Sequence, residues 1–157
     1  MAVQPVPEGY HTVTPYLAVD DATAAIDFYE RAFGAKERLH MSGPADTIAH
    51  AELEIGDALI MLSDPFPQST ARPPKELGGT SAGVFLYVED VDAVYKQAID
   101  AGATSASEPE DMFWGDRFGS VTDPFGHSWQ IATHVEDVSP EEIAKRSEEW
   151  MASMATT

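Results

Sequence analysis

The feature that most constrains the fold of this chain is an internal repeat. Residues 14–35, TPYLAVDDATAAIDFYERAFGA, combine a β-rich stretch, an acidic turn, an amphipathic helix and a glycine, and residues 84–103, VFLYVEDVDAVYKQAIDAGA, repeat that order. Aligning Val19 with Val88 brings the glycines that end the two stretches to within one residue of each other, where a helix C-terminus favours positive φ. The repeat therefore predicts two units that each contain a strand followed by a helix. The expected helix caps are Asp20 or Asp21 in the first unit and Asp90 or Asp92 in the second.

Further strands follow each predicted helix. Residues 46–64, DTIAHAELEIGDALIMLSD, alternate apolar with polar side chains and predict a hairpin around Gly56 and Asp57. Residues 118–134, FGSVTDPFGHSWQIATH, predict a strand, a Pro-Gly turn and another strand. Two βαβββ modules of about equal size follow from this order.

The chain is predicted to form a single domain over residues 1–157, because its length suits one hydrophobic core. A stretch rich in proline and glycine separates the modules, and it lacks the Lys-Ser/Thr pair of a phosphate-binding loop. Near the end, Ser139 and Glu142 form a capping box that predicts a last helix, which we expect to dock on the body or on a partner chain. The expected boundaries are about 12–64 for module 1, 65–82 for the linker, 83–135 for module 2 and 139–154 for the C-terminal helix.

The charge balance excludes several classes of partner. Twenty-seven Asp and Glu against nine Lys and Arg give a net charge of −18, which repels nucleic acid and anionic membrane surfaces and attracts cations. A solvated acidic coat that maintains solubility is the more ordinary interpretation. The chain has no cysteine, no apolar run long enough for a membrane span and no visible export signal, so we expect a cytoplasmic protein.

Four segments carry a family resemblance: YLAVDDATAAIDFYERAFGA, AHAELEIGDALIML, FLYVEDVDAV with the following AGA, and FGSVTDPFGHSWQIAT. In their order and spacing, over about residues 12–135, the chain resembles the vicinal oxygen chelate (VOC) superfamily of glyoxalase I, bleomycin-resistance proteins and extradiol dioxygenases. The resemblance implies an α+β fold in which two modules form a curved, partly closed mixed barrel around a pocket, with the helices outside. It also implies a homodimer.

The metal-dependent members of that superfamily carry a His or Glu ligand on each of four strands. A hydroxyl, a thioether, a glycine and a neutral amide occupy the matching positions here, and these groups do not suit Zn²⁺ or Ni²⁺. We therefore expect no metal and no cofactor. The four matching residues are Thr14, Met61 (or Ile60 if the register differs by one), Gly83 and Gln130.

The histidines offer few other ways to build a metal or catalytic site. His127 and His134 would lie roughly 20 Å apart on one straight strand and would face opposite sides, so they cannot share an ion within a chain. We expect His127 to be a turn or surface residue and His134 an edge or interface group. His50 and Glu52 share a strand face and are the candidate catalytic acid–base pair, with a polar lining or a structural hydrogen bond as the alternative.

Strand alternation predicts which side chains face the pocket. Val13 in the first strand and Trp129 in the last should pack against helices, while their neighbours turn inward. The loop before the seventh strand should place Trp114 and Arg117 at the pocket mouth, where the indole can stack on a ligand and the guanidinium can bind an anion or pair with an acid. The candidate ligand-binding residues are Thr14, Tyr16, Phe85, Tyr87, Trp114, Arg117 and Gln130, with a filled barrel core as the alternative for Tyr16 and Phe85.

Three functions follow from these observations. The first is a glyoxalase/bleomycin-resistance-like protein that binds a small molecule, cationic or aromatic, in an aromatic pocket without metal, as in antibiotic resistance. The second is an enzyme of the same superfamily, a lyase, isomerase or dioxygenase, which uses an unrecognised metal site or acid–base chemistry through His50 and Glu52. The third is a dimerisation or scaffold module with a vestigial pocket.

Overall fold

The computed structural model describes residues 3–155 and has the predicted α+β architecture. Two four-stranded mixed sheets follow the same strand order, β1-β4-β3-β2 and β5-β8-β7-β6, so the repeat in the sequence is a repeat in space. The first module contains β1 (Tyr16–Ala18), α1 (Ala22–Phe33), β2 (Lys36–Ser42), a 3₁₀ turn (Pro44–Asp46), β3 (Ile48–Ile55) and β4 (Ala58–Ser63). After α2 (Pro74–Leu77) come β5 (Gly83–Tyr87), α3 (Val91–Ala101), β6 (Thr104–Asp111), β7 (Asp116–Thr122), β8 (Ser128–His134) and α4 (Pro140–Met154).

The two repeated helices begin and end with the predicted residue types. Asp21 caps α1 by accepting a 2.9 Å hydrogen bond from the Ala24 amide, and Asp90 caps α3 in the same way. Gly34 ends α1 in the left-handed region with φ 65°, which a residue with a side chain rarely adopts. The sequence left two aspartates open at each cap; the structure uses the second of them, Asp21, in the first module and the first of them, Asp90, in the second.

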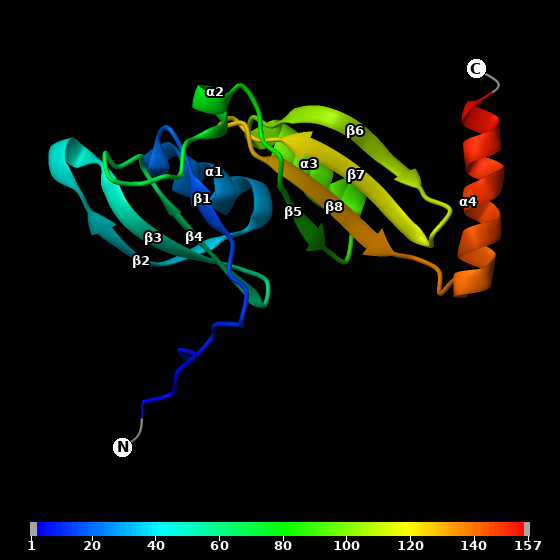
Figure 1. Cartoon of the computed structure of the whole chain (residues 1–157), viewed down its shortest axis with the longest axis horizontal. Helices are drawn as coiled ribbons and strands as arrows, with labels where there is room; N and C mark the ends of the chain where they lie inside the picture. The colour runs from blue at the N-terminus through cyan, green and yellow to red at the C-terminus, as the bar shows by residue number, and fades with distance from the viewer. Residues whose placement is uncertain (1–2, 156–157) are drawn as a thin grey trace.

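The sheets lie side by side without joining (Figure 1). In each sheet the first strand of the module pairs in parallel with the last, as Tyr16 does opposite Met61 and Phe85 opposite Gln130. No strand pairing connects the two sheets within residues 3–155. Hydrogen-bonded strands of one chain therefore do not close a barrel.

The core joins the two modules. Trp129 of β8 is fully buried, as alternation predicts, and its ring lies 4.5 Å from that of Phe33 and 5.1 Å from that of Tyr29, both on α1 of the other module. The buried carboxylate of Asp123 accepts hydrogen bonds from the Tyr29 hydroxyl at 2.6 Å and from the Trp129 indole at 2.9 Å. Module 1 is therefore packed and hydrogen-bonded onto module 2.

Alternation fails at one predicted position. Val13 was expected to pack against a helix, but β1 begins only at Tyr16 and Val13 is 82% exposed in the segment that precedes it. In β5 the pattern holds, since Val84 and Leu86 pack against the core cluster while Phe85 and Tyr87 remain exposed on the other face.

Helix α4 stands apart at the end of the second sheet (Figure 1). Ser139 caps it as predicted, by accepting from the Glu142 amide, and none of its residues is buried. Arg146 holds the helix to the body through a bidentate ion pair with Glu136, and the Trp150 ring lies 5.6 Å from that of Phe113. Among the described residues, no helix combines the length and apolar character needed to cross a membrane.

Candidate functional site

One face of the second sheet exposes a continuous row of rings, which we call the aromatic face: Phe85, Tyr87, Phe118 and Trp114. The Phe85 ring lies 5.1 Å from that of Tyr87 and 5.9 Å from that of Phe118, which in turn lies 6.1 Å from Trp114. Phe85 is 46% and Tyr87 65% exposed. Rings in such numbers at a surface are typical of a binding site, because their burial is favourable and they lose little conformational entropy when they bind.

A buried carboxylate holds two rings of the aromatic face in place. Asp116, the first residue of β7, is 3% exposed and accepts hydrogen bonds from the Tyr87 hydroxyl at 2.9 Å and the Trp114 indole at 3.0 Å. The His134 ring provides a third contact, from Nδ1 at 2.8 Å. Asp116 thus orients three ring-bearing side chains from three segments of the chain.

The same contacts shift the acidities of the network. Burial alone would raise the pKa of Asp116, but the hydrogen bonds from His134, Tyr87 and Trp114 outweigh it and lower the pKa. The hydrogen bond to Asp116 raises the pKa of Tyr87. The network therefore holds an ionised carboxylate below a neutral phenol.

His134 lies between two acids. Its Nδ1 contacts Asp116, and its Nε2 contacts the fully exposed Asp137 at 2.9 Å. The hydrogen bond with Asp116 and that with Asp137 raise the pKa of His134. The sequence placed this residue at an edge or interface, and its part in the network was missed. Counting outward from the Pro-Gly turn of the β7–β8 hairpin pairs Asp116 with His134, a signal that was available.

Arg117 takes the alternative role considered for it, pairing with acids. Its guanidinium forms a bidentate ion pair with Asp92 in the first turn of α3, at 2.6 and 2.8 Å, and contacts Asp111 at 3.1 Å. The hydrogen bonds that Arg117 donates to Asp92 and Asp111 raise its pKa further above its ordinary range. Neighbouring residues of one strand point to opposite faces, so Arg117 does not share the face that Asp116 supports.

On the first sheet, the structure brings three polar candidates together. The Tyr16 hydroxyl lies 3.1 Å from His50 Nδ1, and His50 Nε2 lies 3.4 Å from Glu52. Both imidazole nitrogens therefore have partners within the protein, an arrangement shared by a structural polar lining and by an oriented acid–base pair.

The segment before β1 covers this cluster. Tyr10 lies beside Glu52, and its hydroxyl is buried without a hydrogen bond of good geometry to any described residue. Burial, followed by the Glu52 carboxylate, raises the pKa of Tyr10 to about 12. The nearby Tyr10 hydroxyl lowers the pKa of the Glu52 carboxylate.

The four positions that match the metal ligands of relatives do not fit a metal. Tyr16 and Met61 are paired on neighbouring strands, and the fully packed Ile60 points to the core, so Met61 is the residue on the open face. A Cβ built on Gly83 would lie 2.8 Å from the Gln130 side chain, so the amide already fills the space that a ligand at Gly83 would need. Thr14 is half-buried before β1. Within residues 3–155, no three His, Asp or Glu side chains are grouped as metal ligands.

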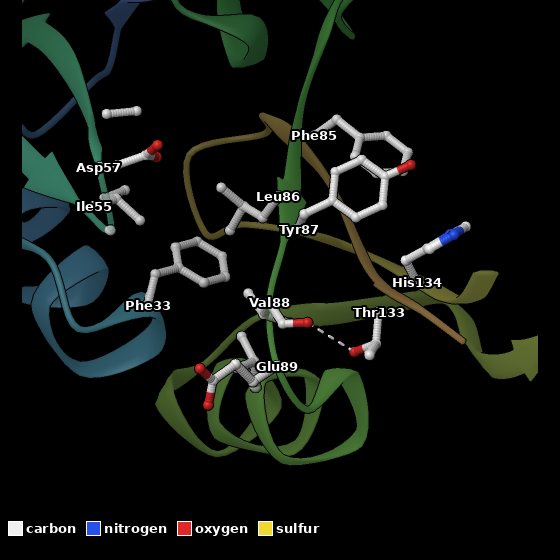
Figure 2. Close-up of a pocket in the computed structure, with 13 residues that line it drawn as sticks. Phe33, Ile55, Asp57, Phe85, Leu86, Tyr87, Val88, Glu89, Thr133 and His134 are labelled. Carbon is white, nitrogen blue, oxygen red and sulfur yellow. Dashed lines mark hydrogen bonds between the residues drawn. The ribbon is translucent and has the colours of Figure 1, made fainter. Parts of the chain in front are cut away.

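A cavity of about 910 Å³ lies along β5, one of the two edge strands of the second sheet. Figure 2 shows Leu86 on the side of β5 that faces Phe33 and Ile55 of the first module, with Phe85 and Tyr87 on the other side. The cavity thus reaches from the aromatic face to a crevice between the modules. Its volume is within the range of small-molecule sites.

The fold consists of two mixed sheets of identical strand order, each with an open face, and helices on the outside. The class of protein that has this architecture follows from a comparison of the sequence with family models. Residues 10–131 match the family model described as the Glyoxalase/Bleomycin resistance protein/Dioxygenase superfamily, and the chain belongs to this family, as the resemblance implied.

Similar proteins extend over most of the chain. An uncharacterized protein of Mycobacterium tuberculosis is 45% identical over 134 residues, which cover 83% of this chain and 79% of that protein. Protein YjdN of Escherichia coli is 30% identical over 146 residues, covering 76% of this chain and 92% of YjdN. Among solved structures, TioX from Micromonospora sp. ML1 superposes with a TM-score of 0.63 at 28% identity, covering 80% of this chain and 99% of TioX.

Proposed function

We propose that the protein binds a small planar molecule on the aromatic face, without a metal ion. The observation that carries the proposal is the row of exposed and half-buried rings, in which the buried Asp116 carboxylate holds Tyr87 and Trp114 in place. A flat ligand would stack on Phe85 and Phe118, and the Tyr87 hydroxyl, which donates to Asp116, keeps its oxygen lone pairs free to accept from the ligand.

The electrostatics favour a cationic ligand. The chain carries a net charge of −18. Arg117, which directly precedes Phe118 of the aromatic face in the sequence, is already paired with Asp92 and Asp111. Aromatic rings attract cations through their negative faces. A planar base therefore suits the site better than a planar acid of the same size.

Binding of proflavine, a planar cation, tests this proposal. We expect its fluorescence and a thermal shift to report saturable binding that is stronger than that of the planar anion anthraquinone-2-sulfonate and unchanged by EDTA. Phe85→Ala and Phe118→Ala should each weaken binding by about five- to tenfold, since loss of a stacking ring typically removes about 1 kcal/mol or more. Leu77→Ala, which removes an exposed apolar side chain from α2, is the matched control. Equal affinity for both dyes, or no effect of the ring deletions, would contradict the proposal.

We further propose that a second copy of the chain packs over the open faces of the two sheets and encloses the ligand of the aromatic face between the two copies. Large apolar side chains remain exposed on both of them, including Tyr16 and Met41 on the first sheet and Tyr87 on the second. The same surface on two copies can pair around a two-fold axis, as in most homodimers. The charge of −18 on each chain opposes association, and salt screens that repulsion.

Light scattering after gel filtration should therefore give about twice 17.0 kDa at physiological salt, with dissociation toward the monomer at low salt. Met41→Arg, on the open face opposite His50, should weaken the dimer. Met154→Arg, on α4, makes the same change elsewhere and should not. A monomer under all salt conditions would refute this arrangement.

A further inference from the structure

The crevice between the modules has walls of a different kind from the aromatic face. Leu86 and Val88 of the edge strand β5 face Phe33 of α1 across it, and all three side chains are only half-buried although they pack against the core cluster. Apolar groups that border a cavity of this size can bury further surface only when something enters it.

Two carboxylates border the opening of the crevice. Asp57 lies in the β3–β4 turn, and Glu89 lies in the connection between β5 and α3. Figure 2 shows them on either side of the Phe33 ring. Both are exposed, and neither forms an ion pair or side-chain hydrogen bond with another described residue. Their charges are therefore uncompensated within the chain.

The Phe33 ring, which lines the same cavity as the two carboxylates, packs against core rings. It is stacked with Tyr29 at an interplanar angle of 17° and lies 4.5 Å from the Trp129 ring, so the core fixes it from behind. An aromatic ring flanked by carboxylates is the arrangement that recognises an ammonium group, because the ring face and the anions both attract positive charge. No Lys or Arg lines the cavity, and its one basic residue, His134, is engaged by Asp116 and Asp137.

We infer that this crevice, at the other end of the cavity from the aromatic face, is a second binding site for a small hydrophobic ammonium compound. The ammonium group lies over Phe33 between Asp57 and Glu89, and the apolar part of the ligand packs along Leu86 and Val88. The site uses residues of both modules, so occupation ties them together.

Calorimetric titration with benzyltrimethylammonium, at low and at physiological salt, tests the inference on the full chain. We expect saturable binding that salt weakens, with N-benzylacetamide and phenylacetate binding at least tenfold more weakly. The double variant Asp57→Asn, Glu89→Gln should lose about tenfold in affinity, because it removes the charge of two exposed carboxylates that attract the ammonium group. A matched double variant, Glu110→Gln with Glu148→Gln, removes the same charge from β6 and α4 and should bind as the unaltered protein does.

Two further variants separate the possible outcomes. Ala58→Trp fills the cavity from an exposed lining position and should abolish binding with the fold retained by circular dichroism. Phe118→Ala disrupts the aromatic face and should leave benzyltrimethylammonium binding unchanged, whatever it does to proflavine. The inference is overturned if the Glu110/Glu148 control weakens binding as much as the Asp57/Glu89 variant does, if N-benzylacetamide binds as well as benzyltrimethylammonium, or if no saturable binding is detected.

Discussion

Replacing Asp123 by alanine is expected to lower the free energy of unfolding by about 3–5 kcal/mol, the largest stability effect of a single change in this chain. The carboxylate is 4% exposed and accepts four hydrogen bonds, from the Tyr29 hydroxyl, the Trp129 indole and the backbone amides of Phe125 and His127. The variant leaves these buried donors without an acceptor and opens a void beside Trp129.

Urea denaturation followed by tryptophan fluorescence measures the effect. Tyr29→Phe removes only one of the four donors and should lower the free energy of unfolding by about 1 kcal/mol. Asp100→Asn breaks an exposed pair with Lys96 on α3 and should lower it by less than about 0.5 kcal/mol. A loss at Asp123→Ala no greater than at Asp100→Asn would show that Asp123 does not hold the two modules together.

Replacing Asp116 by alanine should have the second largest effect, and it should combine stability with function. Three side chains lose their acceptor, so we expect about 2–4 kcal/mol of destabilisation, measured in urea at pH 6. Tyr87 and Trp114 also lose their fixed orientation, and proflavine binding should weaken with them. Asp137→Asn, an exposed change beside the same histidine, is the control and should affect stability little.

The pH dependence gives a second measurement of the same network. The pKa of His134 is raised above its ordinary 6.5, so its stabilising contribution is complete below pH 6.5 and is lost as the pH rises through the folded-state pKa. The pKa of Asp116 is lowered below 3.8, so its contribution is present above that pH and is lost as the pH falls through the folded-state value. An NMR titration of the His134 ring should show a midpoint above 6.5 that drops in Asp116→Ala. A midpoint at or below 6.5 in the unaltered protein would contradict the network.

The fold was predictable because its signals are local. The capping aspartates, the glycines that end the helices and the alternating strands lie within a few residues of each other, and the repeat doubles every signal. The error at Val13 came from extending an alternating pattern past the true start of β1, where no partner strand continues the pairing.

The candidate site was less predictable because its contacts are distant in sequence. Phe85 and Tyr87 could be placed from alternation alone. The partner of Arg117, Asp92, lies on another element, and nothing in the local sequence selects it over nearer acids. The role of His134 depends on the register of the β7–β8 hairpin, which follows from the turn but was not used.

The way Trp129 is buried has a consequence for how the chain melts. Its indole packs against the Tyr29 and Phe33 rings of α1. The core of the second module is therefore completed by a helix of the first module. A half-length fragment cut between α2 and β5 would leave that tryptophan facing water on one piece and Tyr29 without its acceptor on the other. Despite their duplicated design, the halves are thus interdependent in folding, and loss of either should take the other with it in a single cooperative transition.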